Sequence, residues 1–315
     1  MTGSAGPGAD LAGAVAVLAN PTAGHGRRIG VLPTVRDLLA TTGLPVRLLT
    51  AASADEALAA CRRAAAAGAA ALVTVGGDGT VQLALQALAG TGIPLGPIPA
   101  GTGNDFAAGT GLPADPIAAT RVIAQALRDH RSRPVDLARV RTPTGAHRWF
   151  GAVLAAGFDA IVNERANRLR WPSGPRRYDL AILIELARLR PHRYHIGLDG
   201  DRYDVDAVLV AVGNCASYGG GMRICPAADP TDGLLDVVVV GPIGRGTLIR
   251  MKPRVYRGSH VHHPMVRTYR AREVVIDTVA APGRRTGIIG YADGERLGPL
   301  PLTVTAVPGA LRLLR

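Results

Sequence analysis

A single carboxylate lies among three glycines in the stretch LVTVGGDGTVQLAL, residues 72–85. An apolar run precedes this turn and a helical pattern follows it, so the turn joins a buried strand to a helix. Glycines let the backbone approach a ligand closely, and amides at the start of a helix attract phosphate. We therefore expect this turn to bind the phosphates of a nucleotide and Asp78 to hold their metal ion.

Two more glycine-rich loops follow predicted strands, NPTAGHGR at 20–27 and PAGTGNDFA at 99–107. Loops of this kind converge at the carboxyl edge of a parallel sheet, so three of them are far more specific than one. The chain has no G-x-x-x-x-G-K-[ST] motif, and its single lysine, Lys252, lies outside the loops. The protein is therefore not a P-loop NTPase, and glycine amides, a metal ion and arginine must meet the phosphate charge.

Strands and helices alternate in the first part of the chain. Apolar, non-alternating segments predict strands at 13–20, 45–50, 70–75 and 93–101. Helices are predicted from the first loop to about residue 41 and at 53–68, 81–90 and 116–130, where Ser53 and Glu56 form a capping box. This alternation predicts an α/β domain with a parallel sheet covered on both faces.

From about Arg133 the pattern changes to strands joined by turns, with a helical insertion at roughly 158–190. The predicted strands are 134–141, 148–157, 192–200, 202–213, 233–241, 272–279 and 300–307. We expect a flexible N-terminus at 1–10, an α/β nucleotide-binding domain at 11–133 and a β-sandwich substrate domain at 134–315. The last strands of the second domain could pack back on the first.

Charge is unevenly distributed. The net charge is +12, of which residues 1–133 carry +2 (10 Arg, 8 acids) and residues 134–315 carry +10. The segment 245–272 contains eight basic residues and no acid. Such a face attracts an anionic membrane leaflet, which we expect here; a solvated face of an Arg-rich chain is the alternative, and a nucleic-acid partner is not expected.

Composition also bounds the cellular setting. The three cysteines, Cys61, Cys215 and Cys225, have no metal-binding spacing and fit free thiols in a reducing cytosol. The best membrane-like run, at 180–189, is too short to span a bilayer. We expect a cytoplasmic protein that associates peripherally with membranes.

Six motifs occur in order along the chain: NPTAG, GGDGT, GTGNDFA, GFDA at 157–160, DPTDGLLDV at 229–237 and DGE at 293–295. Together they resemble the diacylglycerol kinase catalytic family, in its soluble bacterial branch related to sphingosine and ceramide kinases. The resemblance runs from about Ala14 to the C-terminus. It implies transfer of phosphate from ATP, with Mg²⁺, to a lipid hydroxyl. The expected reaction converts diacylglycerol to phosphatidic acid. The resemblance also implies a lipid partner at an anionic membrane surface, and a homodimer is possible because some relatives are dimers.

The resemblance assigns roles residue by residue. Glu295 matches the proposed general base, Asp78 lies near the catalytic magnesium, and Asp105 is a second acidic partner. Asp232, with the backbone of Asp229 and Leu234, matches a second magnesium site in some bacterial members. The positions that match nucleotide contacts are Asn20, Pro21, Thr22, Ala23, Gly24, Thr50, Gly76, Gly77, Asp78, Gly79, Thr80, Val81, Gln82 and Thr102.

Two positions depart from the family pattern. Gln82 stands where many relatives have Asn, and Ala23 replaces a hydroxyl residue. Because Asp78 and Glu295 come from opposite ends of the sequence, the resemblance and the domain division together place the expected nucleotide site in a cleft between the domains.

Alternatives remain open. GGDGT is shared with NAD kinases, so a kinase for a soluble substrate is one alternative, and a nucleotide- or lipid-binding regulator without catalysis is another. Glu295 could be an ordinary turn carboxylate, and the turn at Asp232 could lack a metal. The helical insertion could form the lipid entrance or pack on the sandwich.

Overall fold

The computed structural model describes residues 10–19, 29–169, 171, 175–278 and 287–315. These form two compact units, one made of the chain up to Leu137 together with Val307–Arg315, the other of Ala138–Ala306. The sequence places a boundary at 133/134; the division in the structure falls inside strand β5, Arg133–Arg141. Residues 1–9 and 20–24, for which the sequence predicts a flexible terminus and nucleotide contacts, lie outside the described residues.

The first unit contains a parallel sheet. Its strands are β1 (Val15–Ala19), β2 (Val46–Leu49), β3 (Ala71–Gly76) and β4 (Pro94–Pro99), in the order β2-β1-β3-β4. All three pairings are parallel, and the end of β16 (Leu302–Leu313) adds a further parallel neighbour to β4. β3 is buried along its whole length, as expected for a strand covered on both faces.

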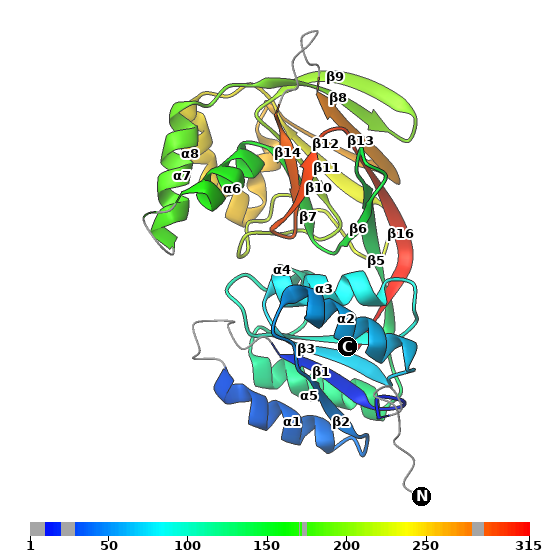
Figure 1. The fold of residues 1–315 in the computed structure, drawn as a ribbon. Helices are drawn as coiled ribbons and strands as arrows, with labels where there is room; N and C mark the ends of the chain where they lie inside the picture. Colours follow the sequence, from blue (N-terminus) through cyan, green and yellow to red (C-terminus); the bar gives the residue numbers. More distant parts are fainter. Residues whose placement is uncertain (1–9, 20–28, 170, 172–174, 279–286) are drawn as a thin grey trace, which may run out of the picture. The chain divides into compact units, whose positions relative to one another are not determined.

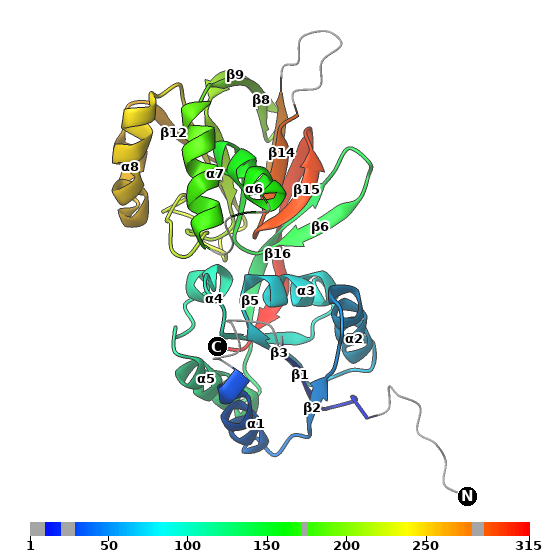
Figure 2. The same ribbon diagram turned by 60° about the vertical axis from the view of Figure 1, so that its left-hand side comes forward.

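Helices cover both faces of this sheet (Figure 1; Figure 2). α1 (Leu32–Ala40) and α5 (Pro116–Arg128) lie on one side, and α2 (Ala54–Ala66) and α3 (Asp78–Leu88) on the other, with short pieces η2 (Ile29–Val31) and α4 (Asp105–Gly109). The predicted Ser53 cap is confirmed at α2: the Ser53 side chain accepts a hydrogen bond from the Glu56 amide at 3.2 Å, whereas the Glu56 side chain accepts one from the amide of Ala52, one residue before the cap, at 2.8 Å. The predicted α/β fold class is confirmed.

The second unit is a β-sandwich. One antiparallel sheet has the order β12 (Val266–Ala271), β11 (Leu235–Val240), β10 (Leu209–Gly213), β7 (Val153–Gly157), β14 (Ile289–Ala292) and β15 (Glu295–Pro299). The other contains β16, β13 (Glu273–Thr278), β8 (His192–Leu198) and β9 (Asp201–Ala207), with β5 and β6 (His147–Phe150) paired beside β16. Alternate residues of the two sheets form the shared core, which includes Leu154, Val210, Val237, Ile196, Val274 and Val304.

Two predicted strands were wrong in their extent. Residues 202–213 form two strands because the chain leaves one sheet at Val208 and enters the other. There the Val208 amide donates to the Val240 carbonyl, and the Phe158 amide donates to the Val208 carbonyl, each at 2.8 Å. Residues 148–157 are likewise divided into β6 and β7.

Helices lie outside the sandwich. The predicted insertion consists of α6 (Phe158–Arg168) and α7 (Pro175–Ala187), which pack on each other and share an Arg165–Glu185 ion pair at 2.6 Å. The sequence did not predict α8 (Arg245–Arg257), which precedes the short η3 (Ser259–His262). Pro253 inside α8 and the few apolar residues on its inner side obscure the helical period. In the described part of the chain, no helix has the length and apolar character needed to cross a bilayer.

Candidate active site

The glycine-rich loops lie at the carboxyl edge of the parallel sheet. Register pairs Leu18 with Leu49, and Gly76 with Pro99, so β1 to β4 all end at this edge. From β1 the chain proceeds to β2 on one side, and β3 then lies on the other side, which makes a topological switch point between β1 and β3. Open α/β sheets bind ligands at such points. The loop after β3 flanks it, and Thr50 follows β2 as an exposed residue.

Asp78 joins the two described glycine loops. Its carboxylate accepts hydrogen bonds from the Asn104 amide at 2.7 Å and the Phe106 amide at 3.4 Å. Asn104 in turn accepts from the Gly101 amide at 2.8 Å and donates to the Gly101 carbonyl at 3.1 Å. The backbones also touch, because a Cβ on Gly101 would lie 2.2 Å from the Gly77 Cα. Gly-Gly-Asp-Gly and Gly-Thr-Gly-Asn-Asp therefore form one interlocked structure.

Two carboxylates converge within this structure. A Cβ at Gly103 would lie 2.5 Å from Asp78 Oδ2 and 3.2 Å from Asp105 Oδ2, so both oxygens border the same small space. Burial, and then the nearby Asp105 carboxylate, raise the pKa of Asp78, against the lowering effect of its amide partners. Mg²⁺ is usually held by one or two carboxylates together with water and phosphate oxygens. The pair fits that requirement, and Asp78 and Asp105 would hold the ion.

The structure separates the predicted nucleotide contacts by exposure. Gly79 and Thr102 are exposed and Gly77 and Asp78 are half-buried. The side chains of Thr80, Val81 and Gln82 are buried. Thr80 packs against Gly76, where a Cβ would come 2.3 Å from the Thr80 hydroxyl oxygen. A phosphate approaching from solvent would meet Gly77 to Gly79 and Thr102 first, and nucleotide contact by the three buried side chains stays a prediction.

Glu295 begins β15, directly after the turn that joins it to β14. Asp293 and Gly294 form this turn with φ values of +49° and +83°. The Asp293 carboxylate accepts hydrogen bonds from the amides of Gly151 at 2.8 Å, Ala152 at 2.9 Å and Val153 at 3.2 Å. Asp293 thus anchors the turn to the start of β7 and leaves Glu295 exposed. An Asp-Gly pair between strand-like segments signals such a turn, but its anchoring partner is not visible in the sequence.

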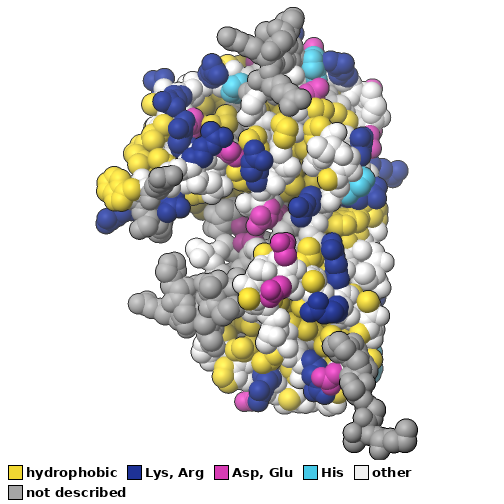
Figure 3. Space-filling view, in the orientation of Figure 1, with side chains coloured by type: hydrophobic (Ala, Val, Ile, Leu, Met, Phe, Trp, Pro, Cys, Tyr) yellow, Lys and Arg dark blue, Asp and Glu magenta, His cyan; other side chains and the backbone are white. Residues whose placement is uncertain are grey.

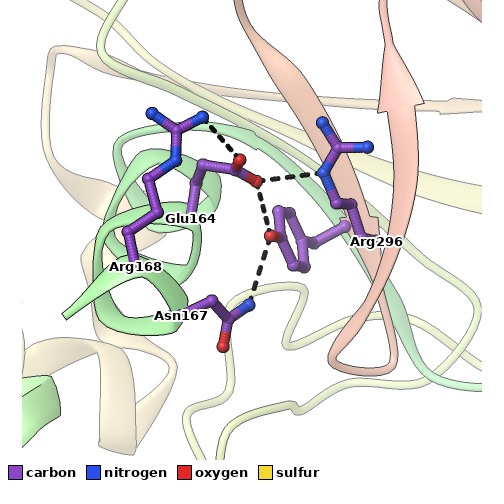
Figure 4. A network of polar contacts seen from close by, with 5 residues as sticks. Glu164, Asn167, Arg168 and Arg296 are labelled. Atoms are coloured by element: carbon purple, nitrogen blue, oxygen red, sulfur yellow. Dashed lines mark hydrogen bonds and ion pairs between the residues drawn. The ribbon is translucent and has the colours of Figure 1, made fainter. Parts of the chain in front are cut away.

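A polar network fixes the same hairpin from helix α6 (Figure 4). Tyr291 donates to Glu164 at 2.8 Å, and the Arg296 guanidinium donates to the same carboxylate oxygen at 3.1 Å. Arg168 donates to the other Glu164 oxygen at 2.8 Å. Burial would raise the pKa of Glu164, but the hydrogen bonds from Tyr291, Arg296 and Arg168 outweigh it and lower the pKa. Because Arg296 directly follows Glu295, Glu164 restrains the backbone that carries Glu295. No motif or spacing in the sequence points to Glu164.

A cavity of about 520 Å³ lies beside α6 and α7 in the second unit. This volume is typical of small-molecule sites. Nearby, at the start of α6, burial raises the pKa of Asp159 in the GFDA motif to about 7. The cavity walls combine apolar and charged residues, namely Phe158, Ile161, Glu185, Arg188, Leu189, Arg190, His192, Val208, Gly287 and Ile288.

The predicted second magnesium site lies in a turn whose carboxylate oxygens could bind a metal ion, and an arginine contacts one of these carboxylates. Asp229 accepts hydrogen bonds from the Thr231 amide at 3.0 Å and hydroxyl at 2.6 Å. Asp232 accepts from the Leu234 amide at 2.9 Å and forms an ion pair with Arg270. Within the described residues no group of three His, Cys, Asp or Glu side chains could hold a metal. A cation here would need backbone oxygens and would share Asp232 with Arg270, so this site stays a prediction.

Family comparisons agree with this architecture. Residues 14–140 match the diacylglycerol kinase catalytic domain, and residues 152–315 match the YegS C-terminal NAD kinase beta sandwich-like domain. A solved structure of a Bacillus anthracis protein superposes with a TM-score of 0.75 at 25% identity, covering 96% of this chain and 97% of that one. Fold and loops together define a two-unit kinase of the lipid-kinase class.

Sequence relatives narrow the class. A Mycobacterium tuberculosis protein named "Diacylglycerol kinase" is 43% identical over 304 residues, 96% of this chain and 95% of the relative. A Xanthomonas axonopodis protein named "Probable lipid kinase YegS-like" is 30% identical over 253 residues, 78% of this chain and 79% of the relative. The chain belongs to the diacylglycerol kinase family with a YegS-type C-terminal domain, and it is a phosphotransferase that acts on a lipid hydroxyl.

Proposed function

We propose that this protein transfers the γ-phosphate of ATP, with Mg²⁺, to the free hydroxyl of diacylglycerol and so produces phosphatidic acid. The observation that carries the proposal is the 43% identity with the Mycobacterium tuberculosis diacylglycerol kinase, which extends over 96% of this chain. The interlocked loops support it, because they present glycine amides and two carboxylates at the switch point of the sheet. Phosphoryl transfer depends on this kind of positioning and charge stabilisation.

Each candidate residue has a distinct task in this reaction. Amides of Gly77 to Gly79 would bind phosphate oxygens, and Asp78 and Asp105 would hold Mg²⁺, which offsets charge on the transferring group. Glu295 would accept the proton of the lipid hydroxyl as its oxygen bonds to the γ-phosphorus and the bond to ADP breaks. The restraint from Asp293 and Glu164 keeps the Glu295 hairpin in one conformation, which a general base requires.

The apolar part of the acceptor needs a place as well. The 520 Å³ cavity offers apolar walls from Phe158, Ile161, Leu189, Val208 and Ile288, and we propose that it receives part of an acyl chain. Its charged residues would then lie near the polar end of the lipid. Sphingoid bases and other lipid alcohols present the same kind of hydroxyl to the same catalytic groups, so the assay compares them with diacylglycerol.

The test is transfer of labelled γ-phosphate from ATP to a defined acceptor. Diacylglycerol, a sphingoid base and NAD should be compared in parallel with Mg²⁺, and with Asp78→Asn as the inactive control. Labelled phosphatidic acid that is absent from the control supports the proposal. Label in NADP, or in the sphingoid base only, would assign another acceptor, and ATP binding without any transfer would indicate a regulator.

A further inference from the structure

The exposed hydrophobic side chains of the described residues are concentrated in one place. Eight large hydrophobic residues are exposed in the described parts of the chain, and five of them lie on α7, on α8 or just before α7. These five are Trp171, Tyr178, Leu183, Ile249 and Tyr256. Trp171 is 80% exposed, Leu183 64% and Ile249 58%. Tyr178 lies on the same side of α7 as the buried Ala181 and Glu185, so the other four are the candidates for an interaction surface.

α8 carries apolar residues on its solvent-facing side as well as on the side that packs against the sheet. Met251 and Val255 point inward and pack against the six-stranded sheet together with Leu189. Ile249, Pro253 and Tyr256 follow each other at helical spacing on the opposite side and are exposed. The packing that holds the helix in place therefore leaves a second, apolar stripe in solvent.

Basic side chains flank this stripe. α8 contains Arg245, Arg250, Lys252, Arg254 and Arg257 and has no acidic residue. Among the described residues, none of the last four has an ion-pair partner, while Arg245 donates to the Ala187 carbonyl at the end of α7. This contact places the start of α8 beside the end of α7, and both ribbon views show the two helices side by side (Figure 1; Figure 2).

α7 presents the same combination. Ala181 and Glu185 are buried, so the side of the helix opposite to them carries Arg176 and Leu183, which lie two turns apart and are both exposed. We call the set Trp171, Arg176, Leu183, Ile249, Arg250, Lys252, Pro253, Arg254, Tyr256 and Arg257 the α7–α8 face. Basic and hydrophobic side chains alternate over the part of the surface where these helices lie (Figure 3).

We infer that the α7–α8 face docks on the surface of an anionic lipid bilayer. Basic residues around an apolar stripe are the pattern of helices that lie in a membrane interface, where Trp and Leu enter the headgroup region and Arg meets lipid phosphate. A second copy of the chain is a poor occupant, because a two-fold contact would bring the same unpaired cations together. Nucleic acid would satisfy the cations but not Leu183 and Ile249.

This inference rests on the proposed function for its purpose, since a bilayer is the source of a lipid acceptor. It rests on the second unit alone for its geometry. Vesicle binding can therefore be measured without ATP, Mg²⁺ or diacylglycerol, and its result is separate from that of the kinase assay.

The experiment is co-sedimentation of the full chain with phosphatidylcholine vesicles, with and without phosphatidylglycerol. Three double variants are compared: Arg250→Glu with Arg257→Glu, Leu183→Ser with Ile249→Ser, and the control Arg62→Glu with Arg121→Glu on exposed positions of the first unit. The charge variant should bind phosphatidylglycerol vesicles at least about tenfold more weakly at low salt. The apolar variant should lose about tenfold at every salt concentration, and the control should bind like the unmodified protein.

Several results would overturn the inference. They are unchanged binding by the face variants, equal loss in the control, or equal binding of the unmodified protein to neutral and anionic vesicles. Binding to a DNA duplex that the charge variant loses and the apolar variant keeps, without vesicle binding, would assign the face to nucleic acid. If vesicle binding follows the expected pattern while no lipid is phosphorylated, the docking surface stands and the proposed function fails. Activity on a water-dispersed short-chain diacylglycerol should be the same in the unmodified protein and all three variants.

Discussion

Replacement of Asp78 separates the structural task of this residue from its chemical one. The carboxylate holds the second glycine loop through the Asn104 and Phe106 amides, yet burial and Asp105 raise its pKa. A raised pKa in the folded protein means that ionised Asp78 lowers stability at neutral pH. Its favourable contribution is present at low pH and is lost as pH rises through the folded pKa, so the contribution of Asp78 to the free energy of unfolding should increase as the pH falls through that pKa.

Two variants give opposite expectations for stability. Asp78→Ala leaves the two amides without their acceptor, at about 1–3 kcal/mol for a buried donor. At roughly 2–4 °C per kcal/mol for a unit of this size, Tm should fall by roughly 2–12 °C. Asp78→Asn keeps an oxygen for the Asn104 amide and removes the charge beside Asp105, so its Tm should equal or exceed that of the unmodified protein. Both variants should lose about 10²–10³-fold or more in kcat, because a neutral side chain is a poor ligand for Mg²⁺.

Thermal unfolding at several pH values and the ATP transfer assay test this reasoning together. The Asn variant should show a smaller rise of Tm on acidification than the unmodified protein. An Asp78→Asn protein as active as the unmodified one would refute the metal-binding role. An Asn variant as unstable as the Ala variant would instead show that the loops need an anion.

Three further expectations concern other parts of the site. Gly101→Ala should lower both Tm and nucleotide affinity because its Cβ would meet the Gly77 backbone, whereas Gly79→Ala has open space, should change the free energy of unfolding by less than about 1 kcal/mol and should weaken only nucleotide binding. Calorimetric ATP titration and thermal unfolding test this, and an equal Tm for both variants would contradict the packing argument. Glu295→Gln should lower kcat by roughly 10²–10⁴ without a change in Tm because the residue is exposed, and a loss confined to KM would argue against a base. Mg²⁺ should raise the Tm of the Asp78→Asn protein, and less so after Asp232→Asn is added, if the turn at Asp232 binds the ion; an identical rise in both would exclude that turn.

Local patterns in the sequence predicted the first unit well, because its determinants are local. Continuous apolar strands, the Ser53 cap and the glycine loops each occupy a few consecutive residues and act within them. The parallel sheet then brings the loops to one edge with no further information. The contact between Asp78 and Asn104 could not be predicted, because the two residues belong to different loops and the sequence of neither loop shows that its residues contact the other loop.

The second unit was harder to predict because long-range contacts define its elements. The 202–213 segment is uniformly strand-like, and only the pairings at Val208 show that it belongs to two sheets. Glu164 and Tyr291 are 127 residues apart, so the network that restrains the Glu295 hairpin left no spacing to detect. α8 was missed for a different reason: it contains Pro253, and apolar residues lie on its outer side (Ile249, Tyr256) as well as on its inner side (Met251), so the contrast that marks an amphipathic helix is weak.

The return of β16 to the first unit has a consequence for synthesis of the protein. Arg312 and Leu313 pair with β4, the Leu314 amide donates to the Leu95 carbonyl at 2.9 Å, and Arg315 donates to the Thr110 carbonyl at 2.7 Å. On the ribosome, β1 to β4 emerge first, but the edge of β4 has no strand partner until β16 has been translated. The unit that is begun first is therefore completed last, after the whole sandwich has been made. An exposed strand edge in a nascent chain can pair with the wrong strand or with another chain. The yield of folded protein should therefore fall when the β4 edge pairs wrongly before β16 has been translated.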